Sequence, residues 1–183
     1  AKTCVVPNGI VLEGFDLASD TMHERLARLI NVPLGTRIVG TVGRLNWTKD
    51  QASLIRAFRI VRRNRPDTAL VLIGDGELRE TLRTCAFDEG VAGSVHFLGD
   101  RDDVRALLQG LDLFALSSVT EGYSMALLEA CATGLPIVTP NVGGNAEIVN
   151  DRTTGRLVPA GDPTSMAQAM LEVLQASGQA QDL

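Results

Sequence analysis

The segment LFALSSVTEGYSMALLEACATGLPIVT, residues 113–139, contains a complete strand–helix–strand unit. It begins with an apolar run, continues through a polar loop into an apolar helical stretch, and ends in a second apolar run after Gly134. A glycine at this position is typical of a helix C-terminus. Apolar runs without polar alternation are typical of strands that are buried on both faces of a sheet. The segment therefore predicts two parallel strands that are joined by a crossover helix.

The same alternation extends over the whole chain of 183 residues. We expect strands at Thr3–Val6, Arg37–Val42, Ala69–Ile73, Val95–Leu98, Leu113–Leu116 and Pro136–Thr139. We expect helices at Met22–Ile30, from Asp50 to near Pro66, at Glu77–Cys85, Asp103–Gln109 and Tyr123–Thr133, and from Asp162 to about Ala176; Thr21 and Asp50 are the expected N-caps of the first two. The repeated β–α–β order predicts an α/β fold. Residues 1–183 would form one Rossmann-like domain, a doubly wound parallel sheet of about six strands with helices on both faces.

Composition and charge exclude several classes of function. The net charge of −5 argues against a general nucleic-acid surface. No apolar run reaches the roughly 20 residues of a membrane span, and no signal peptide is expected at the first residues. Cys4, Cys85 and Cys131 match no zinc or redox spacing, so we expect buried, reduced thiols in a cytoplasmic protein. His23 is expected to face solvent and His96 to lie in the core.

Two carboxylates mark the predicted crossover helix, Glu121 at its mouth and Glu129 inside it. Free N–H groups at a helix opening bind anions, and Gly122 lets a ligand approach the backbone. An ionised carboxylate accepts hydrogen bonds, for which sugar hydroxyls are natural donors. Phosphate on the amides with hydroxyls on both sides describes a nucleotide sugar. In the alternative interpretation, Glu121 only favours the helix dipole and Glu129 is a solvated surface residue.

Ligands of doubly wound sheets bind beyond the carboxyl ends of the strands, so the loops after the expected strands are candidate site segments. Arg44 and Lys49 follow the second expected strand and suit a diphosphate, or they are two solvated loop cations. Gly74 and Gly76 begin a dinucleotide fingerprint that lacks its third glycine. They indicate a turn that passes close to a ligand, or a plain turn.

Taken in order, these residues resemble the C-terminal, donor-binding domain of GT-B glycosyltransferases, specifically the retaining group called family 4. The matching positions are Pro7, Asn8, Gly9, Ile10, Phe15, Gly43, Arg44, Leu45, Lys49, Ile73, Gly74, Asp75, Gly76, Phe97, Leu98, Gly99, Glu121, Gly122, Glu129, Gly134, Pro136, Gly143, Gly144, Glu147, Gly155, Leu157 and Val158. The resemblance implies transfer of a sugar from a nucleotide diphosphate sugar to an acceptor, with retention at the anomeric carbon. It also implies that neither an essential metal nor another cofactor takes part.

The resemblance implies a role for each site residue. Arg44 and Lys49 would hold the donor diphosphate, Glu121 would contact the transferred sugar, and these three would form the catalytic set. Glu129 would bind the ribose hydroxyls. The remaining donor-binding positions are Gly74, Gly122, the amides of Tyr123, Ser124 and Met125 near the phosphates and sugar, and Leu98 to Arg101 around the base.

The chain also departs from the family pattern. Asp50 stands where the family more often has Gly, and Asn145 and Ala146 stand where an apolar residue and Pro are usual. The family's N-terminal acceptor domain is missing, so the chain looks like an excised donor-binding domain. Its expected partners are a nucleotide sugar, an unknown acceptor and its own N-terminal domain, with no nucleic acid. The full-length protein is expected to be cytoplasmic. Peripheral attachment to the inner face of the membrane stays open.

Two other functions stay open on the sequence alone. Sugar-nucleotide 2-epimerases share the two-domain architecture and would act on the donor without an acceptor. A non-catalytic nucleotide-sugar-binding module would bind the donor and never turn it over. A nicotinamide dehydrogenase is disfavoured, because no complete glycine fingerprint follows the first expected strand.

Overall fold

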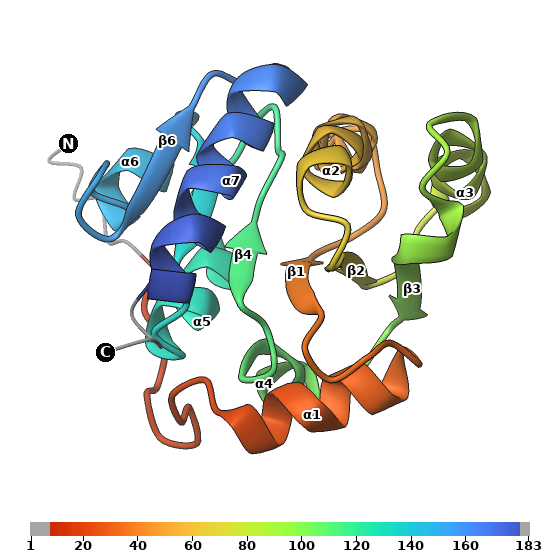
Figure 1. Cartoon of the computed structure of the whole chain (residues 1–183). Helices are drawn as coiled ribbons and strands as arrows, with labels where there is room; N and C mark the ends of the chain where they lie inside the picture. Colours follow the sequence, from red (N-terminus) through yellow and green to blue (C-terminus); the bar gives the residue numbers. More distant parts are fainter. Residues whose placement is uncertain (1–7, 180–183) are drawn as a thin grey trace, which may run out of the picture.

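The computed structural model describes residues 8–179 (Figure 1). In chain order its elements are α1 (Asp20–Leu29), β1 (Arg37–Val42), α2 (Gln51–Asn64), β2 (Thr68–Ile73), α3 (Arg79–Asp88), the 3₁₀ turn η1 (Ala92–Ser94), β3 (Val95–Gly99), α4 (Val104–Leu108), β4 (Leu113–Ala115), α5 (Met125–Ala132), β5 (Ile137–Pro140), α6 (Asn145–Ile148), β6 (Gly155–Val158) and α7 (Pro163–Gln179). The strands form one six-stranded sheet in the order β3-β2-β1-β4-β5-β6, and every pair is parallel. The predicted α/β, doubly wound class is confirmed.

One strand of the six differs from the prediction. The structure's sixth strand is β6, which pairs with β5 at the edge of the sheet, whereas the expected strand Thr3–Val6 lies outside the described residues. Only Val158 of β6 is fully buried. An edge strand that is open on one side needs no continuous apolar run, so the pattern used to find the buried strands does not detect it.

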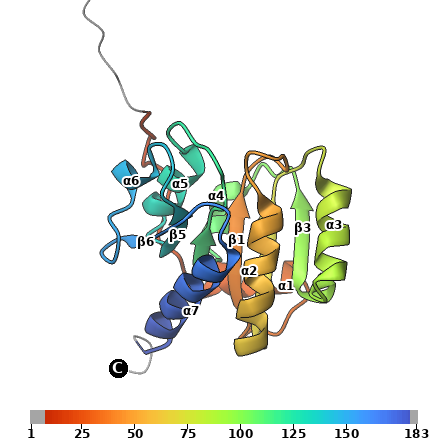
Figure 2. The ribbon, with the colours of Figure 1, turned by 90° about the horizontal axis from the view of Figure 1, so that it is seen from above.

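Helices cover both faces of the sheet (Figures 1 and 2). On one face α2, α3 and α7 pack over a core that includes Phe58, Leu82 and Met170. Figure 2 shows α2 and α7 side by side on that face, in agreement with their contacts. On the other face α1, α4 and α5 pack over a second core with Leu26 and Leu127. This double covering explains why the central strands consist of apolar residues.

Several helix ends differ from the predicted ones. The N-cap of α1 is Ser19, whose side chain accepts the Met22 amide, so the expected cap at Thr21 is wrong. The predicted cap at Asp50 is confirmed by its bond to the Ser53 amide. The short helix α6 was not predicted from the sequence. Among residues 8–179 no helix combines the length and the apolar character that crossing a membrane requires.

The strand order reverses between β1 and β4, which lie side by side although 70 residues of chain separate Val42 from Leu113. Val39 is in register with Leu113, and Gly40 with Phe114. The loops that follow β1 and β4 leave the sheet in opposite directions toward helices on its two faces. In doubly wound folds this reversal opens the crevice in which ligands bind.

Candidate functional site

The loops after β1 and β4 are bonded to one another at the carboxyl edge of the sheet. The Val119 amide donates to the Thr48 carbonyl at 2.9 Å, and the Ser117 hydroxyl donates to the Lys49 carbonyl at 2.7 Å. Asn46 completes the β1 loop, because its side-chain oxygen accepts the amide of Lys49 at 3.2 Å. The backbone around Lys49 is therefore held from two sides.

This arrangement brings two predicted site residues into contact. Lys49 Nζ lies 2.5 Å from Oε1 of Glu121, a residue 72 positions further along the chain. The side chains are only 22% and 10% exposed, so the pair is shielded enough for its attraction to exceed that of an ordinary surface ion pair. A cation and an acceptor of hydroxyl groups thus lie together where the strand order reverses.

The departure at Asp50 has a backbone explanation. Asp50 has φ of 44° and ψ of 46°, the left-handed region in which glycine carries no penalty. Aspartate tolerates this region better than most residues, and its carboxylate caps α2 at the Ser53 amide. The substitution keeps the turn that follows Lys49 and adds a cap to α2.

Arg44 lies in the same loop and is exposed. Within residues 8–179 the structure gives its guanidinium group no hydrogen bond or ion pair. Arg44 lines a cavity of about 610 Å³ together with Gly74, Arg101 and neighbouring residues of the loops after β2 and β3. Arg101 is held by Asp103 through two bonds of 2.8 Å, which lower the pKa of the Asp103 carboxyl. The structure thus places a free guanidinium and a fixed one around one cavity.

The glycines of these loops serve contacts between backbone segments. A Cβ at Gly74 would collide with the Gly43 carbonyl, and one at Gly76 would collide with the backbone of Leu45. Gly74 has φ of +126°, which other residues rarely adopt. The incomplete dinucleotide fingerprint is therefore explained by close packing of the loop after β2 on the loop after β1.

The start of α5 offers backbone amides. Ser124 is the N-cap, because its hydroxyl oxygen accepts from the Leu127 amide. The helix therefore begins at Met125, two residues later than the predicted start at Tyr123. In the described part of the chain no acceptor is found for the amides of Tyr123, Ser124 and Met125. Gly122, just before them, has open space on its Cβ side. Unpartnered amides at a helix start are suited to an anion.

Glu129 lies in α5, eight residues after Glu121, and does not contact it. Burial raises the pKa of the Glu129 carboxyl, and the charge of Arg105 on α4 opposes this rise. No described residue, Arg105 included, forms a hydrogen bond or ion pair with its carboxylate. A half-buried acceptor without a protein partner fits the expected ligand contact better than it fits a solvated surface charge.

Two further expected positions, Leu98 and Arg101, lie in different surroundings. Leu98 on β3 packs against the core on the α1 side, whereas Arg101 lines the Arg44 cavity. Sequence reasoning missed Ser117 and Ser118, whose hydroxyls bond the Lys49 carbonyl and the Glu121 carboxylate. The only sequence signal was the position of Ser118 three residues before Glu121.

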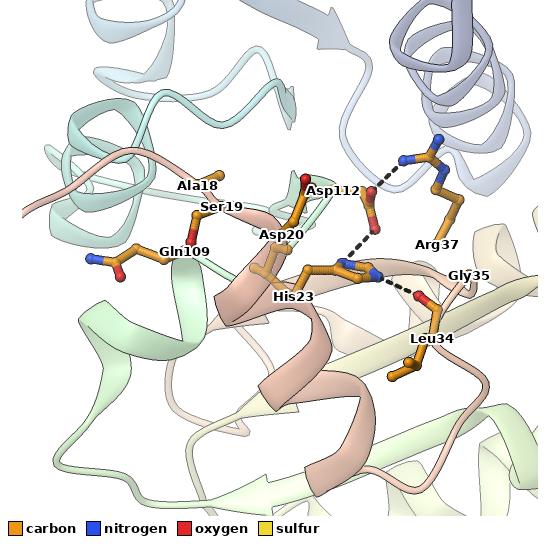
Figure 3. Close-up of a pocket in the computed structure, with 10 residues that line it drawn as sticks. Ala18, Ser19, Asp20, His23, Leu34, Gly35, Arg37, Gln109 and Asp112 are labelled. Carbon is orange, nitrogen blue, oxygen red and sulfur yellow. Dashed lines mark hydrogen bonds and ion pairs between the residues drawn. The ribbon is translucent and has the colours of Figure 1, made fainter. Parts of the chain in front are cut away.

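A second cavity, of about 330 Å³, lies at the opposite edge of the sheet (Figure 3). There Asp112 Oδ1 accepts from Arg37 Nη1 at 2.7 Å, and Asp112 Oδ2 accepts from the Ile38 amide at 2.7 Å. His23 Nδ1 lies 3.4 Å from Asp112 Oδ2, and its ring nitrogens lie within 3.2 Å of the Gly110 and Leu34 carbonyls. The expectation that His23 faces solvent is wrong, because its ring links α1 to the starts of β1 and β4. His96 is half-buried, and burial lowers its pKa. The expectation of buried thiols is wrong for Cys131, which is exposed; Cys85 is partly buried, and Cys4 lies outside the described residues.

Comparisons with known proteins identify the family of the chain. A family model described as "Glycosyl transferases group 1" matches residues 36–176. The chain is 31% identical over 175 residues to UDP-Gal:alpha-D-GlcNAc-diphosphoundecaprenol alpha-1,3-galactosyltransferase of Escherichia coli, covering 94% of this chain and 45% of that protein. It is 31% identical over 183 residues to D-inositol 3-phosphate glycosyltransferase of Corynebacterium urealyticum, covering 95% of this chain and 43% of the relative. The chain thus spans less than half the length of these curated relatives.

The fold is also similar to that of solved structures. The crystal structure of Anabaena Alr3699/HepE in complex with UDP and glucose superposes with a TM-score of 0.84 at 26% identity, covering 94% of this chain and 47% of that one. The resemblance inferred from the sequence is confirmed.

Proposed function

Because the chain belongs to the Glycosyl transferases group 1 family, we propose that it is the donor-binding part of a glycosyltransferase. The whole protein would transfer a sugar from a nucleotide diphosphate sugar to an acceptor, with retention at the anomeric carbon. Residues 1–183 would supply the donor site, and an N-terminal domain outside this chain would supply the acceptor site. The observation that carries the proposal is the Lys49–Glu121 pair at the crevice between β1 and β4.

The proposal assigns the diphosphate to the cations and amides of the crevice. The guanidinium group of Arg44, which has no hydrogen bond or ion pair among the described residues, would fork onto phosphate oxygens, and Lys49 would add a point charge. The unpartnered amides before and at the start of α5 would donate to the same group. As the bond to the sugar breaks, negative charge grows on the leaving phosphate, and donors already in position stabilise it without reorganising.

The two carboxylates would hold the hydroxyl groups on either side of the diphosphate. Glu121, next to Lys49, is assigned to the transferred sugar. Glu129, half-buried and unpaired, is assigned to the ribose. Each carboxylate would exchange hydrogen bonds with water for hydrogen bonds with the donor, which changes the binding energy little. Their main contribution is therefore to orient the donor.

Arg44, Lys49 and the amides would stabilise the negative charge of the leaving diphosphate, so we propose that no metal is essential. The cavity lined by Arg44 and Arg101 is the proposed entrance for the nucleotide, with Leu98 to Arg101 near the base. Uridine nucleotides are the first probes, because UDP appears in the names of the Escherichia coli relative and the Anabaena complex. The epimerase and sensing-module alternatives have no observation in their favour, since the matched family consists of glycosyl transferases.

A binding screen of the 183-residue chain tests the proposal. The chain is mixed in turn with UDP, ADP, GDP, UDP-glucose and UDP-galactose, and thermal shift and then calorimetry measure binding. At least one nucleotide diphosphate sugar should raise the midpoint temperature of unfolding. The matched control is Lys49→Ala, which should abolish most of that shift. Sugar transfer should be undetectable, because one wall of the reaction cleft is missing and water is not excluded. No shift with any nucleotide would overturn the donor-site assignment, and robust transfer would overturn the proposed need for a second domain.

A further inference from the structure

The Glu121 carboxylate uses its two oxygens unequally. Oε1 accepts from Lys49 Nζ at 2.5 Å and from the Ser118 hydroxyl at 2.7 Å. For Oε2 the structure gives no hydrogen bond or ion pair within residues 8–179. One oxygen is therefore occupied by the protein, and the other keeps its capacity to accept hydrogen bonds.

Ser118 is suited to fix the carboxylate and unsuited to touch a ligand. Its exposed fraction is 0%, so no molecule that enters the crevice can reach its hydroxyl. The backbone on either side of it is bonded to neighbouring segments, since the Leu116 amide donates to Val138 and the Val119 amide donates to Thr48, both at 2.9 Å. The hydroxyl thus projects from a backbone that is anchored in two directions.

Lys49 alone cannot provide the same orientation. An ammonium group on a flexible four-carbon chain attracts the carboxylate as a point charge, and the carboxylate plane can still rotate. A second donor at a different, fixed position selects one orientation of that plane. Fixing it before the ligand arrives removes part of the ordering cost of binding.

We propose that Ser118 is a positioning residue that, with Lys49, occupies Oε1 of Glu121 and so presents Oε2 to a hydroxyl of the transferred sugar. The proposal rests on the proposed function, which assigns Glu121 to that sugar. It adds a residue that acts only through Glu121. It therefore predicts a loss that concerns the sugar and spares the nucleoside diphosphate.

The first experiment needs no ligand. Side-chain relaxation of a ¹³C-labelled Glu121 is measured by NMR in the 183-residue chain and in Ser118→Ala, with unfolding curves to show that the variant folds. The expected result is a more mobile Glu121 side chain in the variant. The control is Thr68→Val, which removes another buried hydroxyl, bonded to the Arg65 carbonyl at 2.7 Å, at the amino end of β2. A Glu121 side chain that is equally ordered in Ser118→Ala and in the unmodified chain overturns the proposal.

The second experiment compares UDP with UDP-glucose by calorimetry. Ser118→Ala should lower the affinity for UDP-glucose about tenfold relative to that for UDP, the order expected for one hydrogen bond to a charged group. In a Glu121→Ala background the same substitution should have no further effect on this ratio, because no carboxylate remains to be oriented. Thr68→Val should change neither affinity.

The outcomes separate this proposal from the proposed function. Equal losses for UDP and UDP-glucose, or a full additional loss in the Glu121→Ala background, would mean that Ser118 only maintains the loop, and would overturn the proposal. If the unmodified chain binds no nucleotide sugar, the donor-site assignment fails. The NMR comparison then still decides whether Ser118 orients Glu121.

Discussion

The carbonyl oxygen of Glu121 lies so close to Gly143 that a Cβ on residue 143 would overlap it. Gly143 also has φ of +52°, and the amide of Gly144 donates to the Gly122 carbonyl at 2.8 Å. The loop after β5 therefore contacts the backbone of the residues that carry the candidate sugar contact. Glycine at 143 is required by this contact between loops, in the absence of any ligand.

Gly143→Ala should destabilise the chain and displace Glu121. The left-handed backbone alone costs roughly 1–2 kcal/mol for a residue with a Cβ, and the overlap adds to it. Urea unfolding should therefore show a larger loss than for Gly161→Ala, where φ is +66° and no atom lies within 4 Å of the added carbon. Equal losses in the two variants would contradict the proposed contact. We also expect Gly143→Ala to weaken UDP-glucose binding, and Gly161→Ala to leave it unchanged.

Arg44→Ala and Lys49→Ala should weaken UDP binding and spare uridine. A hydrogen bond to a charged group contributes about 1.5–3 kcal/mol, so each variant should lose roughly tenfold or more in UDP affinity by calorimetry. Arg63→Ala is the matched control for Arg44, because Arg63 is also exposed and lies at the other end of α2. Equal losses for UDP and uridine would argue against a diphosphate contact.

Glu129→Gln should have opposite effects on binding and stability. Loss of the ionised acceptor should weaken UDP binding by ~1–3 kcal/mol, while 2′,3′-dideoxy-UDP should bind both forms alike. Unchanged UDP affinity would refute the ribose assignment.

The stability effect of Glu129→Gln follows from the raised pKa of the carboxyl. Because burial raises this pKa in the folded state, the neutral form favours folding, and stability is lost as the pH rises from the ordinary pKa of 4.5 through the folded pKa. Glutamine stays neutral, so the variant should be more stable than the unmodified chain at pH 7, with little difference at pH 4. Urea unfolding at both pH values measures this, and a variant that is less stable at pH 7 would contradict burial as the cause.

Asp112→Ala should destabilise the fold and leave UDP binding intact. The substitution removes the acceptor of the buried Ile38 amide and one partner of Arg37, at the sheet edge opposite the candidate site. An orphaned buried donor costs about 1–3 kcal/mol. Asp67→Ala, which removes an exposed carboxylate 3.4 Å from Arg65, should cost under about 1 kcal/mol. A similar small loss for both variants would show that the Asp112 cluster is not a structural anchor.

Chelation tests the proposed independence from metals. If Arg44, Lys49 and the helix-start amides carry the diphosphate, UDP affinity should be the same with EDTA and with added magnesium. Calorimetry of the unmodified chain in the two buffers measures this. A requirement for magnesium would overturn the metal-free assignment. It would mean that carboxylates of the protein or phosphates of the nucleotide bind the ion.

Much of the fold was predictable because buried parallel strands leave a local signal. Continuous apolar runs located β1, β2, β3, β4 and β5 to within a residue or two. The edge strand β6 was missed, because three of its four residues are only partly buried and follow no such rule. The start of α1 was misplaced for a related reason: Ser19 and Thr21 are both acceptable caps, and the choice between them depends on contacts outside the helix.

The candidate site was predictable in its residue types and not in its pairings. Glu121, Arg44 and Lys49 were found from chemistry, spacing and the rule that ligands bind at the carboxyl edge. The role of Gly143 was not found, since its neighbour Glu121 comes from another loop, and the role of Ser118 was not found, since its spacing from Glu121 does not show how the loop turns the hydroxyl. His23 was misjudged in the same way, because its partners come from the loop after α1 and the segment before β4.

The amino-acid sequence by itself determined the class of fold, the family and the set of chemically suitable side chains, because hydrophobic periodicity and residue type are local properties. Only the tertiary structure decided that Lys49 meets Glu121, that Ser118 occupies one oxygen of that carboxylate, and that Gly143 lies against the same loop. The contacts of Lys49 and Gly143 with Glu121 join segments that follow different strands, whereas Ser118 and Glu121 share the loop after β4. Their geometry follows from the sheet order, which brings β1 beside β4 and β4 beside β5.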